Sequence, residues 1–377
     1  MSATYQKALE IIQSHIKPLH VNQKLPLLEC INRICGEDIF AHFELPQTPI
    51  SLRDGYGVHL HNDNRYTFTN STTDIQAGFA CQLFTGDAIP KGINAVVADE
   101  EIDFAGENLL TCSLHVEIGH HIKRKGEDIS PHERLLQQGE YLDARKITAI
   151  ASQGISHIVT IQKPKIGILS ISKYLATTMH NSNAVSLGAR IIELGGVIGM
   201  IEECHDENKI IPTLTRMSQT VDLIITTGAM SSSDMMSQTL NNQIFTQLFN
   251  QVDIAPAKPS VLSLVHQIPI LHLPGFPLSC MLGFEMLGLA IVKRLQHQAL
   301  PRPISLINAK MLTCKDDCVS AIPGYSNGNS FRATTHYEAG RLNALSQCNG
   351  YILVEKQEKI EEGESVSFFY FNQPPVS

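Results

Sequence analysis

The sequence of 377 residues has no excess of positive charge: 29 Lys and Arg stand against 37 Asp and Glu, a formal net charge of −8. Because this balance repels a polyphosphate backbone, it argues against nonspecific binding of nucleic acid. The chain also has no hydrophobic run that suits a bilayer, since residues 276–292 fall short of the roughly 20 residues required and contain Pro277 and Glu285. We therefore expect a soluble protein without a membrane segment.

A disulfide framework and an export signal are missing as well. The nine cysteines are scattered and odd in number, which does not suit a secreted, disulfide-stabilised fold. The opening residues lack the apolar core of a signal peptide and instead show helical spacing of Ala8, Ile11, Ile12 and Ile16. These features predict a cytoplasmic protein.

Three common site motifs are also absent. The chain contains no G-x-G-x-x-G fingerprint, no G-x-x-x-x-G-K-[ST] loop and no H-E-x-x-H pair, so dinucleotide, P-loop and common zinc chemistries lack sequence support. The histidine pairs His59/His61 and His120/His121 have no spacing typical of metal ligands, and we interpret them as surface-loop residues.

The pattern of apolar residues divides the chain into parts. From residue 43 to about 117, short apolar pieces separated by Gly, Pro, Asn and Asp predict a small β-rich unit. A helix is predicted over 143–153, with Asp143 as its N-cap. Between about 163 and 298, apolar strands alternate with helices, as in an α/β domain, and β-like pieces return beyond residue 301. The α/β elements are predicted as strands at 165–170, 197–201, 221–226 and 268–273, and as helices at 184–194, 238–249 and from 279.

A ligand site is expected where the parallel strands end. Ligands bind outside the carboxyl ends of such strands, so the loops after residues 170, 226 and 273 should converge on one cleft. The second loop carries backbone N–H and hydroxyl groups ahead of a helix, an arrangement that binds anions. An ordinary strand-to-helix turn explains the same residues equally well. The residues of this loop are Thr227, Gly228, Ser231, Ser232 and Ser233.

Two acids in glycine-containing loops are further candidates. Asp54 precedes Gly55, and Asp128 closes the segment Gly126-Glu127-Asp128, where a carboxylate can reach a metal or ligand. The basic run that begins at Lys123 gives a cationic spot able to receive a phosphate. Taken alone, each feature is also explained by a solvated turn.

Taken in order, several segments resemble the MoeA family, the molybdopterin molybdenumtransferases, which includes the gephyrin E domain. They read DGYGV from Asp54, FTGDAIPKG from Phe84, KRKGEDI from Lys123, TTG from Thr226, KP from Lys258 and LPGFP from Leu273. A closing segment, LSQCNGYI from Leu345, is similar to the family's S-x-x-x-A-N-G-[LI]-I. The resemblance therefore covers nearly the whole chain.

The resemblance implies a multidomain α/β plus β protein. Residues 1–42 and 128–162 are expected to form an elongated domain that includes the N-terminal helix, and residues 43–127 an inserted β-rich domain. Residues 163–299 are expected to form a central MogA-like, three-layer α/β domain with a parallel-rich sheet that binds molybdopterin, and residues 300–377 a C-terminal β-barrel. If 43–127 is an insertion, residues 1–40 should pack against residues of about 128–160.

The resemblance also implies an activity in molybdenum cofactor biosynthesis. The family takes adenylylated molybdopterin and molybdate, hydrolyses the phosphoanhydride with Mg²⁺, and releases AMP and the finished cofactor. It acts as a homodimer with active sites between protomers, and other proteins of cofactor biosynthesis are candidate partners. Catalytic roles are expected for Asp54, Asp128 and Thr85, and metal-side roles for Asp54, Asp128 and Asp234. Substrate binding is expected from Thr227, Gly228, Ser231, Ser232, Ser233, Lys258, Pro274, Pro277 and Lys123.

Several positions depart from the family motifs. The family's T-G-D-E-L reads ISKYL here, so its acids are replaced by Lys173 and Tyr174, and the last Asp of S-G-G-V-S-x-G-x-x-D is replaced by Met236. Methionine and tyrosine cannot replace a carboxylate on Mg²⁺. An alternative function is therefore a MoeA-like paralogue, weakened or inactive, that binds pterin, nucleotide or a partner protein without inserting metal. The remaining departures are Ala255 in K-P-G-K-P, which keeps Lys258, Phe276 in L-P-G-N-P, and Ala339 for a serine of the last domain.

Overall fold

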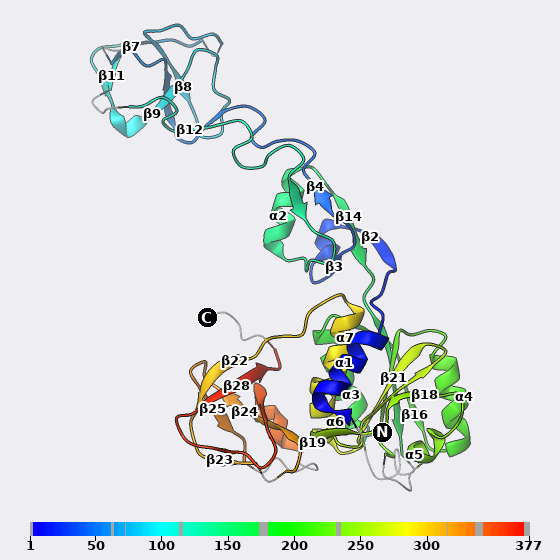
Figure 1. The fold of residues 1–377 in the computed structure, drawn as a ribbon. Coiled ribbons are helices and arrows are strands. Elements are labelled where there is room, and N and C mark those ends of the chain that lie inside the picture. The colour runs from blue at the N-terminus through cyan, green and yellow to red at the C-terminus, as the bar shows by residue number, and fades with distance from the viewer. Residues whose placement is uncertain are drawn as a thin grey trace. The chain divides into compact units, whose positions relative to one another are not determined.

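A computed structural model describes residues 3–61, 64–71, 73–112, 116–172, 180–230, 235–314, 316–335 and 342–372. The chain divides into two compact units (Figure 1). Unit 1 comprises Met1–Gln23, Asn32–Ile34 and Thr160–Ser377, and unit 2 comprises Lys24–Ile31 and Cys35–Val159. Within the described ranges, no helix is long and apolar enough to span a membrane.

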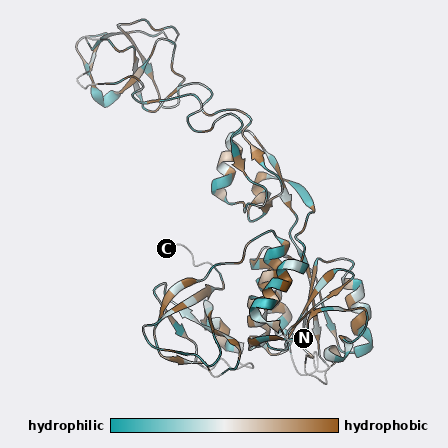
Figure 2. Ribbon diagram, viewed as in Figure 1, coloured by the Kyte–Doolittle hydropathy of each residue, from teal (hydrophilic) through white to brown (hydrophobic). Residues whose placement is uncertain are grey.

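Unit 1 contains a six-stranded sheet in which four neighbouring strands are parallel and two further strands are antiparallel. Residues of the same strand contribute to two cores on opposite faces of the sheet. Ile166 and Ile168 are buried in one core, and Leu169 and Ile171 are buried in the other. This double burial explains the continuous apolar runs of the parallel strands, which are brown in Figure 2. In sheet order the strands are β16 (Val197–Cys204), β15 (Lys165–Ile171), β17 (Leu223–Thr227), β21 (Ile268–Leu273), β20 (Val261–Val265) and β18 (Thr246–Phe249).

Helices cover both faces of this sheet. Residues of α3, α6 and α7 share one core with the sheet, and residues of α4 and α5 share the other, which gives three layers. The opening helix α1 packs on α7 through Ala8, Ile12 and Ile16, so it belongs with unit 1, whereas the sequence assigned it to the elongated domain. The helices are α1 (Tyr5–His15), α3 (Ser182–Glu193), α4 (Glu207–Met217), α5 (Met235–Thr239), α6 (Pro277–Gly283), the π-turn η3 (Phe284–Gly288) and α7 (Leu289–Leu295).

The C-terminal residues form a closed five-stranded barrel, since β26 pairs with β24 as well as with β28. Its interior contains Phe331, Ile352 and Phe368. The parallel pairing of β19 (Val252–Ala255) with both β24 and β1 (Ala3–Thr4) extends the barrel sheet. The fold class predicted for this part, a parallel-rich α/β sheet and a β-barrel, is confirmed. In order around the barrel the strands are β24 (Val319–Ser326), β25 (Ser330–Ala333), β22 (Ile304–Asn308), β28 (Ser365–Tyr370) and β26 (Gly350–Val354), and β23 (Leu312–Thr313) pairs with β27 (Lys359–Ile360).

Unit 2 contains a six-stranded sheet of short strands. Buried Val58, Tyr66, Ala80 and Leu110 form one of its two small cores. The small β-rich region predicted from the sequence is therefore present. Its strands, in sheet order, are β10 (Ile102–Phe104), β11 (Leu109–Cys112), β7 (Arg65–Phe68), β8 (Phe79–Leu83), β6 (Gly55–Val58) and β9 (Ala95–Ala98).

A third core of unit 2 joins segments far apart in the sequence. Strand β4 (Ile39–Phe40) pairs with β13 (Arg134–Leu136), and Ile39 is buried together with Leu142 and Ile150. The predicted contact between residues 1–40 and about 128–160 is thus present. Helix α2 (Ala144–Ser152) begins at the predicted N-cap Asp143. The remaining elements are β2 (Asn22–Pro26), β3 (Ile34–Cys35) and β14 (His157–Ile161), which form one sheet, and the pair β5 (Ile50–Ser51) and β12 (Ile122–Lys123).

Two parts of the sequence fold differently from the prediction. The helix predicted over 238–249 is wrong, because α5 ends at Thr239 and Thr246–Phe249 form the edge strand β18. Asn242 turns the chain between them, with its Oδ1 accepting a hydrogen bond of 3.1 Å from the Ile244 N–H. Helix α4 is not expected from the sequence, since Pro212 lies inside it. It forms because Leu214 and its apolar neighbours are buried against the sheet.

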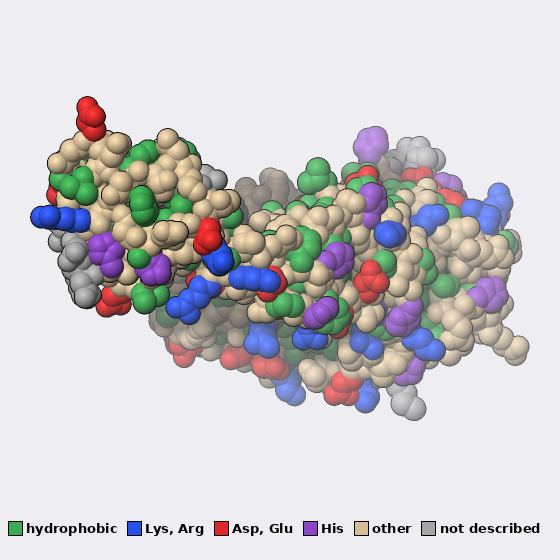
Figure 3. Space-filling model, turned by 90° about the horizontal axis from the view of Figure 1, so that it is seen from above, with side chains coloured by type: hydrophobic (Ala, Val, Ile, Leu, Met, Phe, Trp, Pro, Cys, Tyr) green, Lys and Arg blue, Asp and Glu red, His purple; other side chains and the backbone are tan. Residues whose placement is uncertain are grey.

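Charged side chains of both signs are interspersed over the face seen in Figure 3. Among the described residues seen there, neither sign is confined to one part of the face.

His272 is enclosed in the sheet between two hydroxyl groups. Its Nδ1 lies 2.8 Å from Thr226 Oγ1 and its Nε2 lies 2.9 Å from Ser263 Oγ. Burial lowers its pKa to about 3, so the ring stays neutral in the folded protein, while the unfolded chain takes up a proton below pH of about 6.5.

The free energy of unfolding should therefore depend on His272 in acid. Because the folded pKa lies below the unfolded one, the contribution is complete above pH of about 6.5 and is lost as the pH falls toward 3. Between pH 6 and 4, His272 should make the unfolding free energy of the parent protein fall by about 1.4 kcal/mol per pH unit. The His272→Gln variant should lack this part of the slope. Urea unfolding at several pH values measures this slope, and equal slopes in both proteins would contradict the assignment.

Candidate functional site

The carboxyl ends of β15, β17 and β21 meet at one point, as the sequence predicts. Gly228 has a φ of +93°, and a Cβ on it would lie 2.4 Å from the carbonyl oxygen of Ile171. Its N–H donates a hydrogen bond of 3.1 Å to Leu273 O. A Cβ on Gly275 would lie 3.1 Å from Gly228 Cα. Glycine at these positions therefore allows the three loops to approach one another.

The Thr227 side chain holds two of these loops together. Its hydroxyl donates to Pro274 O at 3.1 Å, accepts from Asn183 Nδ2 at 2.9 Å, and lies 3.4 Å from Cys280 Sγ. Burial raises the pKa of Cys280 to about 12, so the thiol keeps its proton. Thr227 is only 3% exposed, and its hydroxyl is already hydrogen bonded within the protein.

Asn183 is a further candidate site residue that the sequence prediction missed. Its Nδ2 donates to Thr227 Oγ1 and, at 2.8 Å, to Gly275 O. Since Gly275 O can only accept, the amide orientation is fixed and Oδ1 is left on the other side. This buried oxygen has no hydrogen-bond partner among the described residues. An unpaired buried acceptor is suited to an N–H donor of a ligand.

The sequence offered a signal beside Asn183 rather than for its contacts. The run Asn181-Ser182-Asn183 directly precedes the predicted helix, where Asn is a preferred N-cap. Asn181 fills that position, with its Oδ1 accepting from the Ala184 N–H at 3.2 Å and from Ser170 Oγ at 2.8 Å.

The other predicted residues of unit 1 fall into two groups. Pro277 is the first residue of α6, and Lys258 is exposed in the loop before β20. This loop lies at the same end of the sheet, because Val261 at the start of β20 pairs with His272. The positions outside the described residues are Ser231, Ser232, Ser233 and Asp234, together with the replaced positions Lys173 and Tyr174.

A substitution at Gly228 tests the close approach of the loops. We expect Gly228→Ala to lower the free energy of unfolding by at least about 1 kcal/mol more than Gly328→Ala, because overpacking adds to the backbone strain. Gly328 is a matched control, since its φ is +95° and a Cβ on it would meet no atom within 4 Å. Equal effects in urea unfolding would show that the contact with Ile171 is not tight.

In unit 2, Asp54 and Thr85 form a pair. Asp54 Oδ1 accepts hydrogen bonds from the Thr85 N–H at 2.7 Å and from Thr85 Oγ1 at 2.8 Å. The bond from the Thr85 N–H, and to a smaller extent the bond from the Thr85 hydroxyl, lower the pKa of the exposed Asp54 carboxyl. Asp54 is therefore ionised at neutral pH, and its second oxygen faces away from this pair of bonds. The sequence predicted both residues as site residues, and the structure brings them together.

Lys123 and Asp128 form a second pair. Lys123 Nζ lies 3.0 Å from Asp128 Oδ2, and the neighbouring Lys125 Nζ lies 2.8 Å from Glu44 Oε1. Strand β12, which contains Lys123, pairs with β5, so this loop runs beside residues 50–51. The charge of Asp128 is thus already matched by a lysine, which the sequence had assigned to substrate binding.

Two family models match the chain, one on each side of residue 160. The model described as "MoeA N-terminal region (domain I and II)" matches residues 3–154, and the model described as "Probable molybdopterin binding domain" matches residues 167–297. The chain belongs to the MoeA family.

Similar proteins carry the same family name. Molybdopterin molybdenumtransferase of Haemophilus influenzae is 26% identical over 301 residues, which cover 73% of either chain. The protein of the same name from Bacillus subtilis is 24% identical over 364 residues, 87% of this chain and 81% of that one. The crystal structure of the molybdopterin biosynthesis MoeA protein of Pyrococcus horikoshii covers 98% of this chain, with a TM-score of 0.86 at 20% identity. That last likeness confirms the multidomain MoeA fold.

The MoeA family position occupied by Met236 lies in the core. Met236 is fully buried among the apolar residues between the sheet and α4 and α5, and its N–H donates to Ala229 O at 3.2 Å. A methionine in this place provides packing and no oxygen ligand.

A hard divalent cation such as Mg²⁺ fits Asp54 better than Asp128. Asp54 is an exposed, ionised carboxylate with one oxygen outside its two hydrogen bonds to Thr85. Asp128 is paired with an ammonium group that a cation would have to displace. Mg²⁺ commonly takes one or two protein carboxylates and completes its shell with water and substrate phosphates, so a single acid suffices on the protein side.

Proposed function

We propose that this MoeA family chain is a molybdopterin molybdenumtransferase of molybdenum cofactor biosynthesis. In this proposal, molybdate is inserted into adenylylated molybdopterin and AMP is released. The observation that carries it is the buried Asn183 Oδ1, which has no partner among the described residues, at the point where β15, β17 and β21 end in the region matched by the molybdopterin binding model. The names of the relatives support the same reaction.

The site suits a substrate that combines a pterin with phosphates. Pterin rings carry N–H donors, and Asn183 Oδ1 is an acceptor that needs one. The phosphates call for positive charge and N–H groups, which Lys258, the loop after Thr227 and the start of α6 at Pro277 supply. The carbonyl oxygen of Pro274 accepts a hydrogen bond from the Thr227 hydroxyl, and this bond fixes the loop that would face the substrate.

The catalytic acids belong to unit 2 in this proposal. Asp54, held by Thr85, would bind Mg²⁺, and Lys123 with Asp128 would present an ammonium to an anionic substrate. When bound, Mg²⁺ neutralises phosphate charge that develops during cleavage of the phosphoanhydride. The protein's own part is to hold the Asp54 carboxylate in place through the two Thr85 hydrogen bonds, which also lower its pKa.

A cytoplasmic homodimer is part of the same proposal. Light scattering of the purified chain measures its mass in solution, and a monomer of 41.6 kDa at micromolar concentration would contradict it.

The buried position of Met236 favours a second candidate function. A family acid is replaced there by a core residue, which fits a paralogue that binds pterin, nucleotide or a partner protein without inserting metal. The two functions differ in turnover, so one experiment separates them.

The experiment is rescue of molybdoenzyme activity in a cell that lacks its own MoeA protein. We expect expression of this chain to restore the activity, and expression of its Asp54→Ala variant to restore much less. A well-expressed wild-type chain that restores nothing would exclude the enzymatic function in favour of the binding paralogue.

A further inference from the structure

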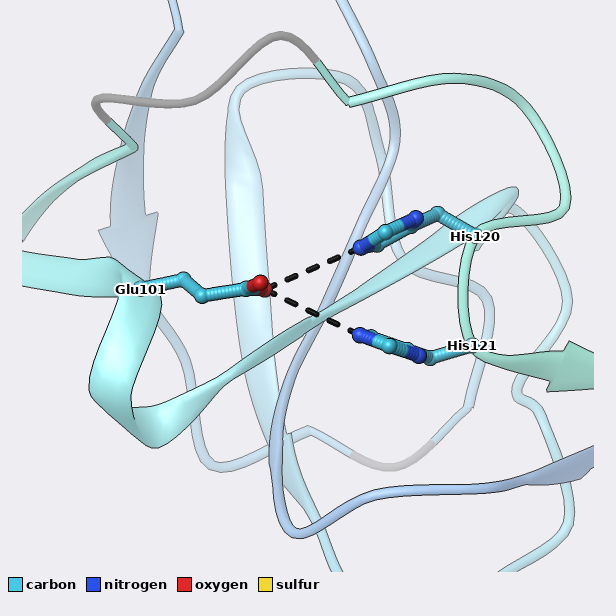
Figure 4. A group of neighbouring side chains, drawn as sticks. All are labelled: Glu101, His120 and His121. Atoms are coloured by element: carbon cyan, nitrogen blue, oxygen red, sulfur yellow. Dashed lines mark ion pairs between the residues drawn. The ribbon is translucent and has the colours of Figure 1, made fainter.

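Three side chains of unit 2 with metal-binding atoms lie together outside the site described above. The Nε2 atoms of His120 and His121 lie 3.7 Å and 3.8 Å from Glu101 Oε2. Figure 4 shows both rings directing these nitrogens toward the carboxylate. One ligand atom from each residue lies within 4.8 Å of the others. The sequence analysis interpreted the two histidines as surface-loop residues. The structure places them beside a carboxylate, in a group that could hold a metal ion.

Backbone hydrogen bonds hold all three residues in place. Glu101 ends the 3₁₀ turn η2 (Asp99–Glu101), and its Oε2 accepts a bond of 3.2 Å from the Ala98 N–H. The carbonyl oxygen of His120 accepts from the Val96 N–H at 2.9 Å, and that of His121 from the Leu52 N–H at 2.8 Å. These bonds fix His120 and Glu101 to β9, and His121 to the residue that follows β5, before any ligand arrives.

We propose that Glu101, His120 and His121 form a binding site for a divalent transition metal ion of the zinc type, with water completing the coordination. Two imidazoles and one carboxylate suit Zn²⁺, Ni²⁺ or Cu²⁺, whereas Mg²⁺ prefers oxygen ligands. Around a tetrahedral zinc with bonds of about 2.1 Å, neighbouring ligand atoms are about 3.4 Å apart. The two separations between Glu101 and the histidines, 3.7 Å and 3.8 Å, need to close by a few tenths of an ångström, and no two of the three ligand atoms are more than 4.8 Å apart.

Solvent access is favourable for such an ion. The three side chains are 25–34% exposed, so an ion can enter and keep water ligands. Of the charged groups around the His121 ring, Glu101 and Glu100 attract a cation and Arg53 repels one.

The competing explanation is a plain ion pair between Glu101 and a protonated histidine. Such a pair needs a charged imidazole and no metal ion, whereas coordination needs a neutral ring nitrogen. The two explanations differ in one observable, which is stoichiometric uptake of metal.

The test uses the untagged full-length chain, freed of metal with a chelator and titrated with ZnCl₂ in calorimetry and equilibrium dialysis. We expect one Zn²⁺ per chain, and X-ray absorption at the zinc edge that shows imidazole and oxygen ligands without sulfur. Glu101→Gln and His121→Asn should each weaken binding by at least about tenfold. Asparagine is chosen because the φ of His121 is +51°, a conformation that Asn tolerates.

Matched controls separate coordination from general charge effects. Glu100→Gln removes the neighbouring exposed negative charge, and His157→Gln removes an exposed histidine elsewhere in unit 2. His157→Gln should bind Zn²⁺ like the parent, Glu100→Gln should lose less affinity than Glu101→Gln, and circular dichroism should show all variants folded. Absence of stoichiometric uptake, sulfur ligands at the zinc edge, or equal affinity of Glu101→Gln and Glu100→Gln would overturn the proposal. Because the readout is zinc binding, the outcome is independent of the molybdenum reaction.

Discussion

The Asp54→Ala variant is expected to fold like the parent protein and to insert molybdate about 10–100-fold more slowly. Asp54 is an exposed loop residue whose carboxylate bonds to Thr85, so its removal costs little packing. Of the two candidate acids Asp54 and Asp128, Asp128 is paired with Lys123. The variant therefore loses the candidate acid that is not paired with a lysine. The rate of AMP release by the purified variant, with circular dichroism as a check of folding, measures the effect.

Two further variants sharpen this prediction. Asp103→Ala removes an exposed acid from the same β-rich part and should leave turnover unchanged. Thr85→Val removes the hydroxyl bond to Asp54 and keeps the backbone bond, so a smaller loss is expected. If Asp54→Ala turns over at the parent rate, Asp54 is a turn residue and the metal lies elsewhere.

The Arg190→Met variant is expected to lose about 3–5 kcal/mol of unfolding free energy. Arg190 and Glu285 are 6% and 3% exposed at their side chains, and they form a two-point pair with Nε–Oε1 of 2.6 Å and Nη2–Oε2 of 3.1 Å. Arg190 also donates to Phe371 O and to Asn372 Oδ1, so it ties α3 to the end of the chain's last strand. Removal of the guanidinium leaves a buried carboxyl without its partner.

The pH dependence and a double variant test the cause. Burial raises the pKa of Glu285 against the pull of Arg190, so without Arg190 the carboxyl takes up a proton more readily in the folded state. A folded pKa above the unfolded one gives stability that is lost as the pH rises. The deficit of Arg190→Met should therefore be larger at pH 8 than at pH 5. Arg190→Met with Glu285→Leu should recover most of the loss, and a double variant as unstable as the single one would contradict this explanation.

The sequence predicted the helices and strands whose apolar residues form a clear local pattern. The runs of β15, β17 and β21 are continuous because both faces of the sheet are covered, and that pattern is local. The end of α5 was missed because Leu240, Ile244 and Leu248 follow one another at intervals of four residues, as in a helix, and the turn at Asn242 overrides this pattern. Glu285, which interrupts an apolar stretch, is explained only by Arg190, 95 residues away.

The candidate site was predictable where one motif contains the chemistry and unpredictable where distant segments assemble it. Asp54 and Thr85 were each expected, but their hydrogen bond depends on strand pairing. The contacts of Asn183 reach 44 and 92 residues along the chain, to Thr227 and Gly275, so no local pattern reveals its unpaired oxygen. Glu101 and His121 meet because backbone bonds to residues 52 and 96 place them together.

The measurement that tests the central claim most directly is AMP release by the purified chain. The chain is mixed with adenylylated molybdopterin, molybdate and Mg²⁺, and AMP is quantified together with the activation of a molybdenum-free apoenzyme. We predict AMP release that depends on molybdate and activates the apoenzyme, reduced at least about tenfold by Asp54→Ala. A folded chain that binds adenylylated molybdopterin but releases no AMP would contradict the transferase function.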